Sequence, residues 1–340
     1  MTTAGCARTI SVMGTCATIE VFPAQSDQTG AVGCAIDRAL GWFRHIEQIC
    51  SRFDPVTELA RVTHRIGEPV QVSRLLYEAV EFGVAIAEET AGAFDPTVGI
   101  DMERRGFDRE YRTGHSIRTD APGSSSASYR DITLDRERRS ITLHRALMLD
   151  LGAIVKGLAV DLAAREVARF ENFVIDAGGD LFVAGRRPDG APWKIGIRHP
   201  RRDGALIDVV LVSGVAVCTS GDYERRIGDD GPHHIVDGRT RTDAALLASA
   251  TVIAPSAMVA DGLATAAFVL GPKDGIRLLE RQGVEGLLIT PALERHATRG
   301  FPSDSSILQD AQGPSDGRPL SVDGHRHPDR GTRADLGCPD

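Results

Sequence analysis

The order of strand-like and helix-like segments along this chain constrains its fold more than any other feature. Between residues 131 and 219, short segments rich in β-branched and aromatic residues follow one another, with charged or Gly-rich turns between them. Segments with apolar residues at helical spacing flank and interrupt this run. Because the strands come in runs and do not alternate strictly with helices, the sequence predicts an α+β fold instead of a parallel, doubly wound sheet.

The period of the hydrophobic pattern predicts the individual elements. Apolar residues recur every three or four positions, as in helices, at residues 31–51, 73–90, 153–170, 256–270 and 273–282. Strands are expected at residues 9–22, 131–134, 140–143, 173–176, 181–184, 193–198, 207–212, 215–219 and 286–289. Residues 9–22 are expected to form a single strand at a sheet edge. Ser73 is a suitable N-cap for the helix predicted at residues 73–90.

The two ends of the chain are expected to lie outside the folded part. Residues 1–8 are predicted to be a flexible N-terminus and residues 9–301 one folded domain. Residues 302–340 contain no aromatic residue and are dominated by Gly, Pro, Asp, Arg and Ser. Such a segment buries too little apolar surface to offset the entropy lost on ordering, so we predict a disordered tail.

Charge and composition exclude several classes of protein. The net charge is −8, from 39 Lys and Arg against 47 Asp and Glu, and no basic block occurs, which argues against a nucleic-acid partner. No stretch approaches the roughly 18 apolar residues of a membrane span. Since the N-terminus lacks a charged leader and an apolar core, we expect a cytoplasmic protein. The six cysteines are scattered, which argues against a zinc site or a disulfide framework.

Asp261 and Thr265 are the first candidates for chemistry. They are four residues apart on a predicted helix and therefore share one face. Both offer oxygen ligands of the kind that Mg²⁺ binds together with substrate phosphates. The structural alternative is a helix with Asp261 in solvent and the Thr265 hydroxyl bonded to the preceding turn.

Residues 149–161 are a second candidate, read as a strand that passes through a Gly turn into a helix. Free backbone N–H groups at a helix N-terminus form a ready anion site, to which Lys156 adds a positive charge. The pattern of a P-loop is absent, and an ordinary strand-to-helix connection remains the alternative.

Three further segments are compatible with either a site or a plain turn. Residues 176–180 contain two glycines between strands, which by default form a hairpin turn. Asp95 precedes a proline and is expected to begin a turn. Residues 219–223 and 233–237 bring Asp and His residues that could form an acid–base group, although adjacent histidines on a strand face opposite sides, so at most one faces a given pocket.

The order and number of these motifs resemble the ApbE-type FAD:protein FMN transferases, or flavin transferases. The matching segments cover roughly residues 10–290, nearly all of the predicted folded part. In chain order they are residues 13–15 (MGT), 51–59 (SRFDPVTEL), 92–99 (GAFDPTVG), 150–157 (DLGAIVKG), 177–180 (AGGD), 219–223 (TSGDY), 234–237 (HIVD) and 260–265 (ADGLAT).

The resemblance implies a function and a set of site residues. Members cleave FAD, release AMP and attach FMN by a phosphoester bond to a Ser or Thr of an acceptor flavoprotein. It implies two interlocked subdomains of mainly antiparallel sheet flanked by helices, with FAD between them. Implied ligands of Mg²⁺ or Mn²⁺ are the Ala153 carbonyl, Asp261 and Thr265, and His234 and Asp237 are implied to act in catalysis. Implied FAD contacts are Met13, Phe53, Ala93, Phe94, Asp95, Asp150, Lys156 and His234.

The sequence departs from the ApbE pattern in several places. Phe53 stands where Tyr is common, and Leu158 stands where a Tyr often follows Lys-Gly. The pattern His-His-Ile-Ile-Asp-Pro-x-Thr-Gly becomes HHIVDGRTR at residues 233–241, and we expect a more mobile loop there. Many members also carry an export signal, which this sequence lacks.

Two other functions are compatible with the same residues. An FAD pyrophosphatase would use water in place of the acceptor hydroxyl and yield FMN and AMP. A non-catalytic FAD-binding protein would bind FAD without releasing AMP. The intact set of metal ligands and the Lys156 segment favour the transferase.

Overall fold

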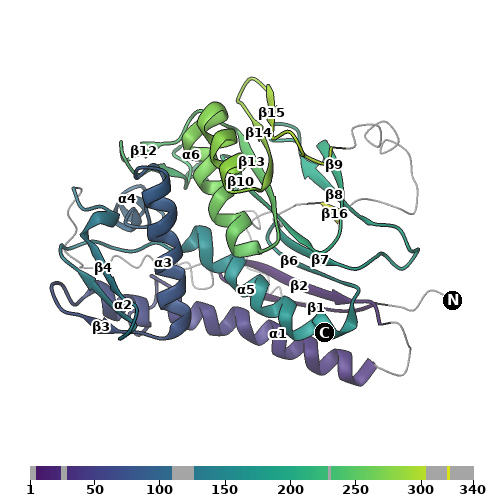
Figure 1. Ribbon diagram of the computed structural model, residues 1–340, viewed down its shortest axis with the longest axis horizontal. Helices are drawn as coiled ribbons and strands as arrows, with labels where there is room; N and C mark the ends of the chain where they lie inside the picture. The colour runs from purple at the N-terminus through teal and green to yellow at the C-terminus, as the bar shows by residue number, and fades with distance from the viewer. Residues whose placement is uncertain (1–4, 24–28, 109–125, 229–230, 304–319, 322–340) are drawn as a thin grey trace.

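An eight-stranded antiparallel sheet forms the centre of the protein (Figure 1). The computed structural model describes residues 5–23, 29–108, 126–228, 231–303 and 320–321. In spatial order, the strands of the sheet are β1 (Cys6–Val12), β2 (Thr15–Val21), β6 (Phe173–Ala177), β7 (Asp180–Ala184), β10 (Val215–Gly221), β13 (Ser249–Ala254), β14 (Glu285–Ile289) and β15 (Arg295–Ala297). Each neighbouring pair is antiparallel, which together with the helices confirms the predicted α+β class.

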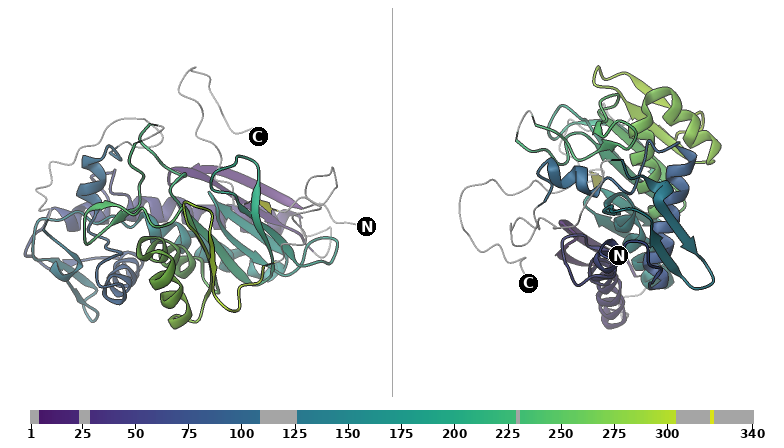
Figure 2. Two further views of the ribbon diagram at one scale, coloured as in Figure 1. Left: turned by 90° about the horizontal axis from the view of Figure 1, so that it is seen from above. Right: turned by 90° about the vertical axis from the view of Figure 1, so that its left-hand side faces the viewer.

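Three long helices cover one face of this sheet (Figures 1 and 2). They are α1 (Thr29–Cys50), α5 (Gly152–Val167), which continues into the 3₁₀ helix η3 (Ala168–Phe170), and α6 (Ala257–Arg281). The other face packs against a small sheet of β8 (Trp193–Arg198), β9 (Leu206–Val212) and β16 (Leu320–Ser321). Side chains along β7 point alternately to the two faces of the large sheet. Leu181 and Val183 pack in the hydrophobic core shared with the small sheet, whereas Phe182 packs in the core shared with the helices.

A smaller unit lies at one end of the molecule (Figures 1 and 2). The chain leaves the large sheet after β2, passes along α1, builds this unit and returns through α5. Its sheet consists of β3 (Val70–Gln71), β5 (Ser140–Leu143) and β4 (Ile132–Asp135). The accompanying helices are α2 (Glu58–Thr63), α3 (Arg74–Glu89), α4 (Gly99–Arg104) and the 3₁₀ helix η2 (Tyr129–Asp131). A short hairpin of β11 (Val236–Asp237) and β12 (Thr242–Asp243) follows later in the chain.

The long helices predicted from periodicity are confirmed, and Ser73 caps α3 by accepting a hydrogen bond from the Leu76 N–H at 3.3 Å. The single strand predicted at residues 9–22 is wrong. Met13 and Gly14 have φ values of 52° and 74°, so the chain makes a tight turn there and forms two paired strands. Strand β13 was not predicted, because it is buried on both faces and shows no alternation of apolar and polar residues.

The predicted tail, residues 302–340, lies mostly outside the described residues. Within the tail, residues 320–321 pair in parallel with β8. In the part of the chain that the structure describes, no helix combines the length and hydrophobicity that crossing a bilayer requires.

A close contact between α5 and α6 fixes how these two helices lie. Gly157 makes the contact possible, since a Cβ atom there would lie 2.3 Å from the carbonyl oxygen of Ala257. One turn further along α5, the Asp161 carboxylate accepts hydrogen bonds from the Ser256 hydroxyl at 2.6 Å and from the N–H groups of Ala257 and Met258 at 2.7 and 3.0 Å. The first N–H groups of a helix have no partner within it, and a carboxylate there also suits the helix dipole. Residues of α5 therefore set the position of α6.

We predict that Gly157→Ala lowers the free energy of unfolding by about 1–3 kcal/mol, because the added methyl group forces α5 and α6 apart. Urea denaturation followed by circular dichroism measures this change. The matched control is Gly41→Ala in α1, where no atom lies within 4 Å of the added Cβ, and helix propensity should raise stability by about 0.5–1 kcal/mol. Equal stabilities of the two variants would contradict the proposed contact.

Candidate functional site

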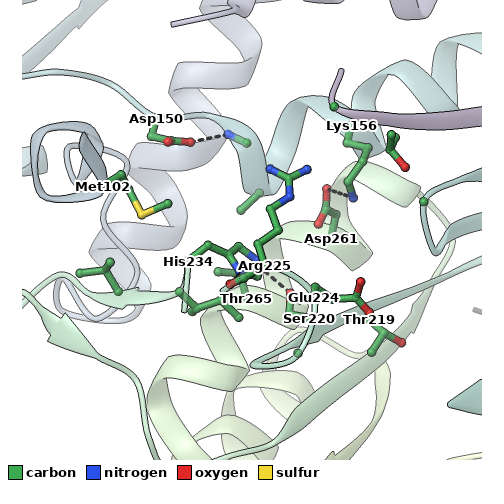
Figure 3. Close-up of a pocket in the computed structure, with 18 of the residues that line it drawn as sticks. Met102, Asp150, Lys156, Thr219, Ser220, Glu224, Arg225, His234, Asp261 and Thr265 are labelled. Carbon is green, nitrogen blue, oxygen red and sulfur yellow. Dashed lines mark hydrogen bonds and ion pairs between the residues drawn. The ribbon is translucent and has the colours of Figure 1, made fainter. Parts of the chain in front are cut away.

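A cavity of about 700 Å³ lies between the large sheet and the smaller unit. Segments that are far apart in the sequence line it: the β1–β2 turn, the turn after α3, the N-terminus of α5, the end of β10, residues 234–236 and α6 (Figure 3). The volume lies within the range of about 300–1,000 Å³ that is typical of ligand sites.

The structure brings most of the sequence-predicted site residues to this cavity. Those that line it are Phe94, Asp95, Asp150, Ala153, Lys156, His234, Asp261 and Thr265. Those that do not are Met13, Phe53, Ala93 and Asp237.

The four residues outside the lining have identifiable structural surroundings. The Met13 N–H donates a hydrogen bond to Glu47 Oε1 at 2.8 Å, beside the lining residue Gly14. Ala93 is fully buried, and the Phe53 ring lies 4.1 Å below the guanidinium carbon of Arg52.

The Asp237 side chain pairs with Arg239 in the same loop. Its carboxylate accepts hydrogen bonds from the backbone N–H of Arg239 at 2.9 Å and from the guanidinium at 2.6 and 3.0 Å. Both carboxylate oxygens of Asp237 are therefore bonded within this loop. The loop at 238–241, which we expected to be more mobile, is held at its start by a hydrogen bond from the Gly238 N–H to the Ala93 carbonyl at 2.9 Å.

Asp150 closes the N-terminus of α5 at one wall of the cavity. Its Oδ1 accepts a hydrogen bond from the Gly152 N–H at 2.8 Å, and its Oδ2 accepts one from Arg52 Nε at 2.8 Å. Arg52 is buried and also donates to the Phe107 carbonyl at 2.6 Å. Sequence reasoning matched the segment around Arg52 to the ApbE pattern but did not single out this residue.

Lys156 lies between two carboxylates, those of Asp180 and Asp261, and Figure 3 shows its contact with Asp261. Its ammonium forms an ion pair with Asp180 and lies 3.5 Å from Asp261 Oδ2, which also accepts a hydrogen bond from the Gly157 N–H at 3.4 Å. Burial raises the pKa of Asp261, and the Lys156 charge opposes this shift. Asp261 is only 5% exposed, so the alternative that placed it in solvent is wrong.

The oxygen atoms around Asp261 fit a hard divalent cation. Ala153, Asp261 and Thr265 line the same cavity, and the Thr265 hydroxyl lies 2.9 Å from the Ser220 hydroxyl. Among the described residues, no three His, Cys, Asp or Glu side chains gather into a metal site of their own. A cation here would thus depend on mixed donors, namely one carboxylate, one hydroxyl and one main-chain carbonyl. Such oxygen donors suit Mg²⁺ or Mn²⁺ shared with substrate oxygens.

His234 lines the cavity as a neutral imidazole. Removal from water lowers its pKa to about 3, and the nearby Arg225 and His233 add to this shift. Its Nδ1 lies 3.4 Å from the Arg225 carbonyl oxygen, and its ring meets that of Phe107 edge-on at 6.5 Å. Arg225, which sequence reasoning missed, extends its guanidinium into the cavity (Figure 3).

The neighbouring His233 faces away from the cavity. It is 4% exposed, its Nε2 lies 3.0 Å from the Ala244 carbonyl oxygen, and its ring packs edge-on against Phe268. The prediction that at most one of the two adjacent histidines faces a pocket is therefore confirmed.

Comparisons with known proteins agree with the fold. The family model described as "ApbE family" matches residues 13–288. The FAD:protein FMN transferase of Haemophilus influenzae is 30% identical over 253 residues, which is 70% of this chain and 73% of the relative. That of Treponema pallidum is 31% identical over 326 residues, 87% of this chain and 88% of the relative.

Solved structures give the same result. The ApbE protein of Thermotoga maritima has a TM-score of 0.75 at 30% identity and covers 87% of this chain and 97% of its own. The flavin transferase ApbE of Vibrio cholerae has a TM-score of 0.72 at 26% identity and covers 88% of this chain and 99% of its own. The fold is thus that of a transferase enzyme. The chain belongs to the ApbE family.

We predict that stability falls on acidification and that His234 contributes to the fall. Its folded pKa of about 3 lies below the ordinary value of 6.5, so below pH 6.5 the unfolded chain takes up a proton that the folded chain does not. The free energy of unfolding should therefore decrease from pH 6.5 toward pH 3. Urea denaturation at pH 7, 6 and 5 should show a shallower decrease for His234→Gln than for the wild type. His45→Gln, at an exposed position of α1, is the control. Identical pH slopes for wild type and His234→Gln would contradict the assignment.

Proposed function

We propose that this protein is a divalent-cation-dependent FAD:protein FMN transferase. It would cleave FAD, release AMP and attach FMN by a phosphoester bond to a Ser or Thr of an acceptor flavoprotein. The observation that carries this proposal is the meeting, in one cavity, of the α6 oxygens of Asp261 and Thr265 with the Lys156-bearing first turns of α5. Membership of the ApbE family supports the same activity.

The cavity has the charges that a diphosphate needs. Lys156 and Arg225 bring positive charge to it, and Gly152 and Ala153 at the N-terminus of α5, the positive end of the helix dipole, line the same space. The Ala153 carbonyl, Asp261 and Thr265 would hold the cation, which when bound would neutralise the phosphate oxygens and polarise the phosphorus for attack.

The transfer step needs a base. The oxygen of the acceptor hydroxyl forms a new bond to the phosphorus of the FMN half, the bond between this phosphorus and the AMP oxygen breaks, and the hydroxyl proton must be accepted. His234 lines the cavity, and an Nδ1–H directed at the Arg225 carbonyl oxygen would leave its Nε2 lone pair free to accept a hydrogen bond from the hydroxyl. We assign it the role of accepting that proton or orienting the hydroxyl.

One incubation tests the proposed function and separates it from its alternatives. The protein is mixed with FAD, MgCl₂ or MnCl₂ and acceptor fragments that carry a candidate Thr, and AMP is measured by chromatography. Flavin fluorescence on a denaturing gel, together with AMP, would support the transferase. AMP without a fluorescent acceptor would show an FAD pyrophosphatase, and bound FAD without AMP would show a binding protein.

We predict that Asp261→Asn lowers FAD cleavage by more than about 100-fold at millimolar Mg²⁺, because the substitution removes the charged oxygen donor. Initial rates across a Mg²⁺ titration measure the effect. The control is Asp208→Asn, a fully buried aspartate outside the cavity lining that pairs with Arg295. If Asp261→Asn keeps the wild-type dependence on Mg²⁺, the assigned cation site is wrong.

We further predict that His234→Ala abolishes covalent flavin transfer while FAD still binds, since the variant loses the proposed proton acceptor but keeps the cation-binding oxygens. Gel fluorescence of the acceptor and equilibrium dialysis with FAD give the two readouts. Full transfer by this variant would reject the role assigned to His234.

A further inference from the structure

Arg241 adopts a backbone conformation that few residues other than glycine tolerate. Its φ is 59°, in the left-handed region, at the position where the ApbE pattern described above has Gly. Its N–H donates a hydrogen bond to the Asp237 carbonyl at 2.7 Å and closes the turn between β11 and β12. A side chain placed here costs conformational free energy, so its contacts must offset that cost.

The Arg241 guanidinium makes such contacts with the smaller unit. It is 16% exposed, and Nη1 donates to Asp101 Oδ2 at 3.1 Å. Nη2 donates to the Ala127 carbonyl at 2.5 Å and to Thr97 Oγ1 at 3.4 Å, and it lies 3.7 Å from Asp95 Oδ2. A planar guanidinium can satisfy several acceptors at once in this way, whereas an ammonium cannot do so in the same geometry.

A second arginine strengthens the same connection from the opposite side. Arg105, which follows α4, donates to the Arg241 carbonyl at 2.9 Å and forms an ion pair with Asp243. We call Arg105 and Arg241 together the arginine clamp. It joins the β11–β12 hairpin to residues 95–101 and to residue 127, and it does so with groups that are largely shielded from water.

The two segments joined by the clamp form adjoining walls of the cavity. Phe94, Asp95 and Met102 belong to one wall, and residues 234–236, which lead into β11, belong to the other. We infer that Arg241 is a positioning residue that fixes the distance between these walls and thereby sets the affinity of the cavity for its ligand. That this ligand is FAD rests on the proposed function, whereas the connection between the walls does not.

The test compares Arg241→Gly with Arg139→Gly. Arg139 also has a positive φ, 48°, in the turn between β4 and β5, but its side chain is exposed, so Arg139→Gly reports the backbone effect alone. In Arg241→Gly without ligand, amide hydrogen exchange across residues 234–243 should rise at least fivefold and the dissociation constant for FAD about tenfold. Arg139→Gly should leave both within twofold of the wild type.

Two further variants keep the inference falsifiable. Asp101→Asn removes the negative charge that pairs with Arg241 from the other wall and should raise exchange across residues 234–243, even if Arg241→Gly fails to fold. Arg241→Lys keeps the positive charge but lacks the planar guanidinium. If this variant bound FAD as tightly as the wild type, the role assigned to the guanidinium geometry would be overturned. Unchanged exchange in both Arg241→Gly and Asp101→Asn would overturn the clamp itself. If the wild type bound no FAD, the proposed function would be rejected. The hydrogen-exchange data would still show whether the arginine clamp joins the two walls.

Discussion

The packing of α5 against α6 is the constraint on which the candidate site depends. One helix carries Lys156 and the other carries Asp261, and these charges meet only because Gly157 lets the two backbones approach. Asp180, Lys156 and Asp261 form a largely buried group in which one ammonium lies between two carboxylates. Removing Lys156 would leave the two carboxylates away from water without their positive partner, which is strongly unfavourable. Helix packing and this ionic attraction therefore reinforce each other.

The periodicity of hydrophobic residues predicted most of the helices and strands, but it did not predict the doubly buried strand β13 or the turn at Met13. Helix α1 repeats its apolar positions over 22 residues, so its existence follows from the sequence alone. Strand β13 is buried on both faces, and its apolar run does not distinguish a strand from a buried helix segment. The turn at Met13 was missed because a non-glycine residue with positive φ gives no clear signal in a single sequence.

The same limit explains which site residues the sequence could predict. Asp261 and Thr265 share a helix face, a relation that spacing alone determines, whereas their proximity to Ala153 depends on tertiary structure. Arg52 and Arg225 could not be singled out, because Arg is abundant in this chain and only the fold decides where a long side chain ends.

The connectivity of the large sheet has a consequence for how the protein is made. Strand β2 pairs with β6, although about 150 residues separate them along the chain, and the cavity also takes residues from α6. Closing so long a loop costs chain entropy that no local contact repays, so such pairings form late in folding. During synthesis the smaller unit emerges from the ribosome before β6 does. A nascent chain that ends before Thr265 can therefore have no complete ligand site, and binding becomes available only after α6 has been synthesised.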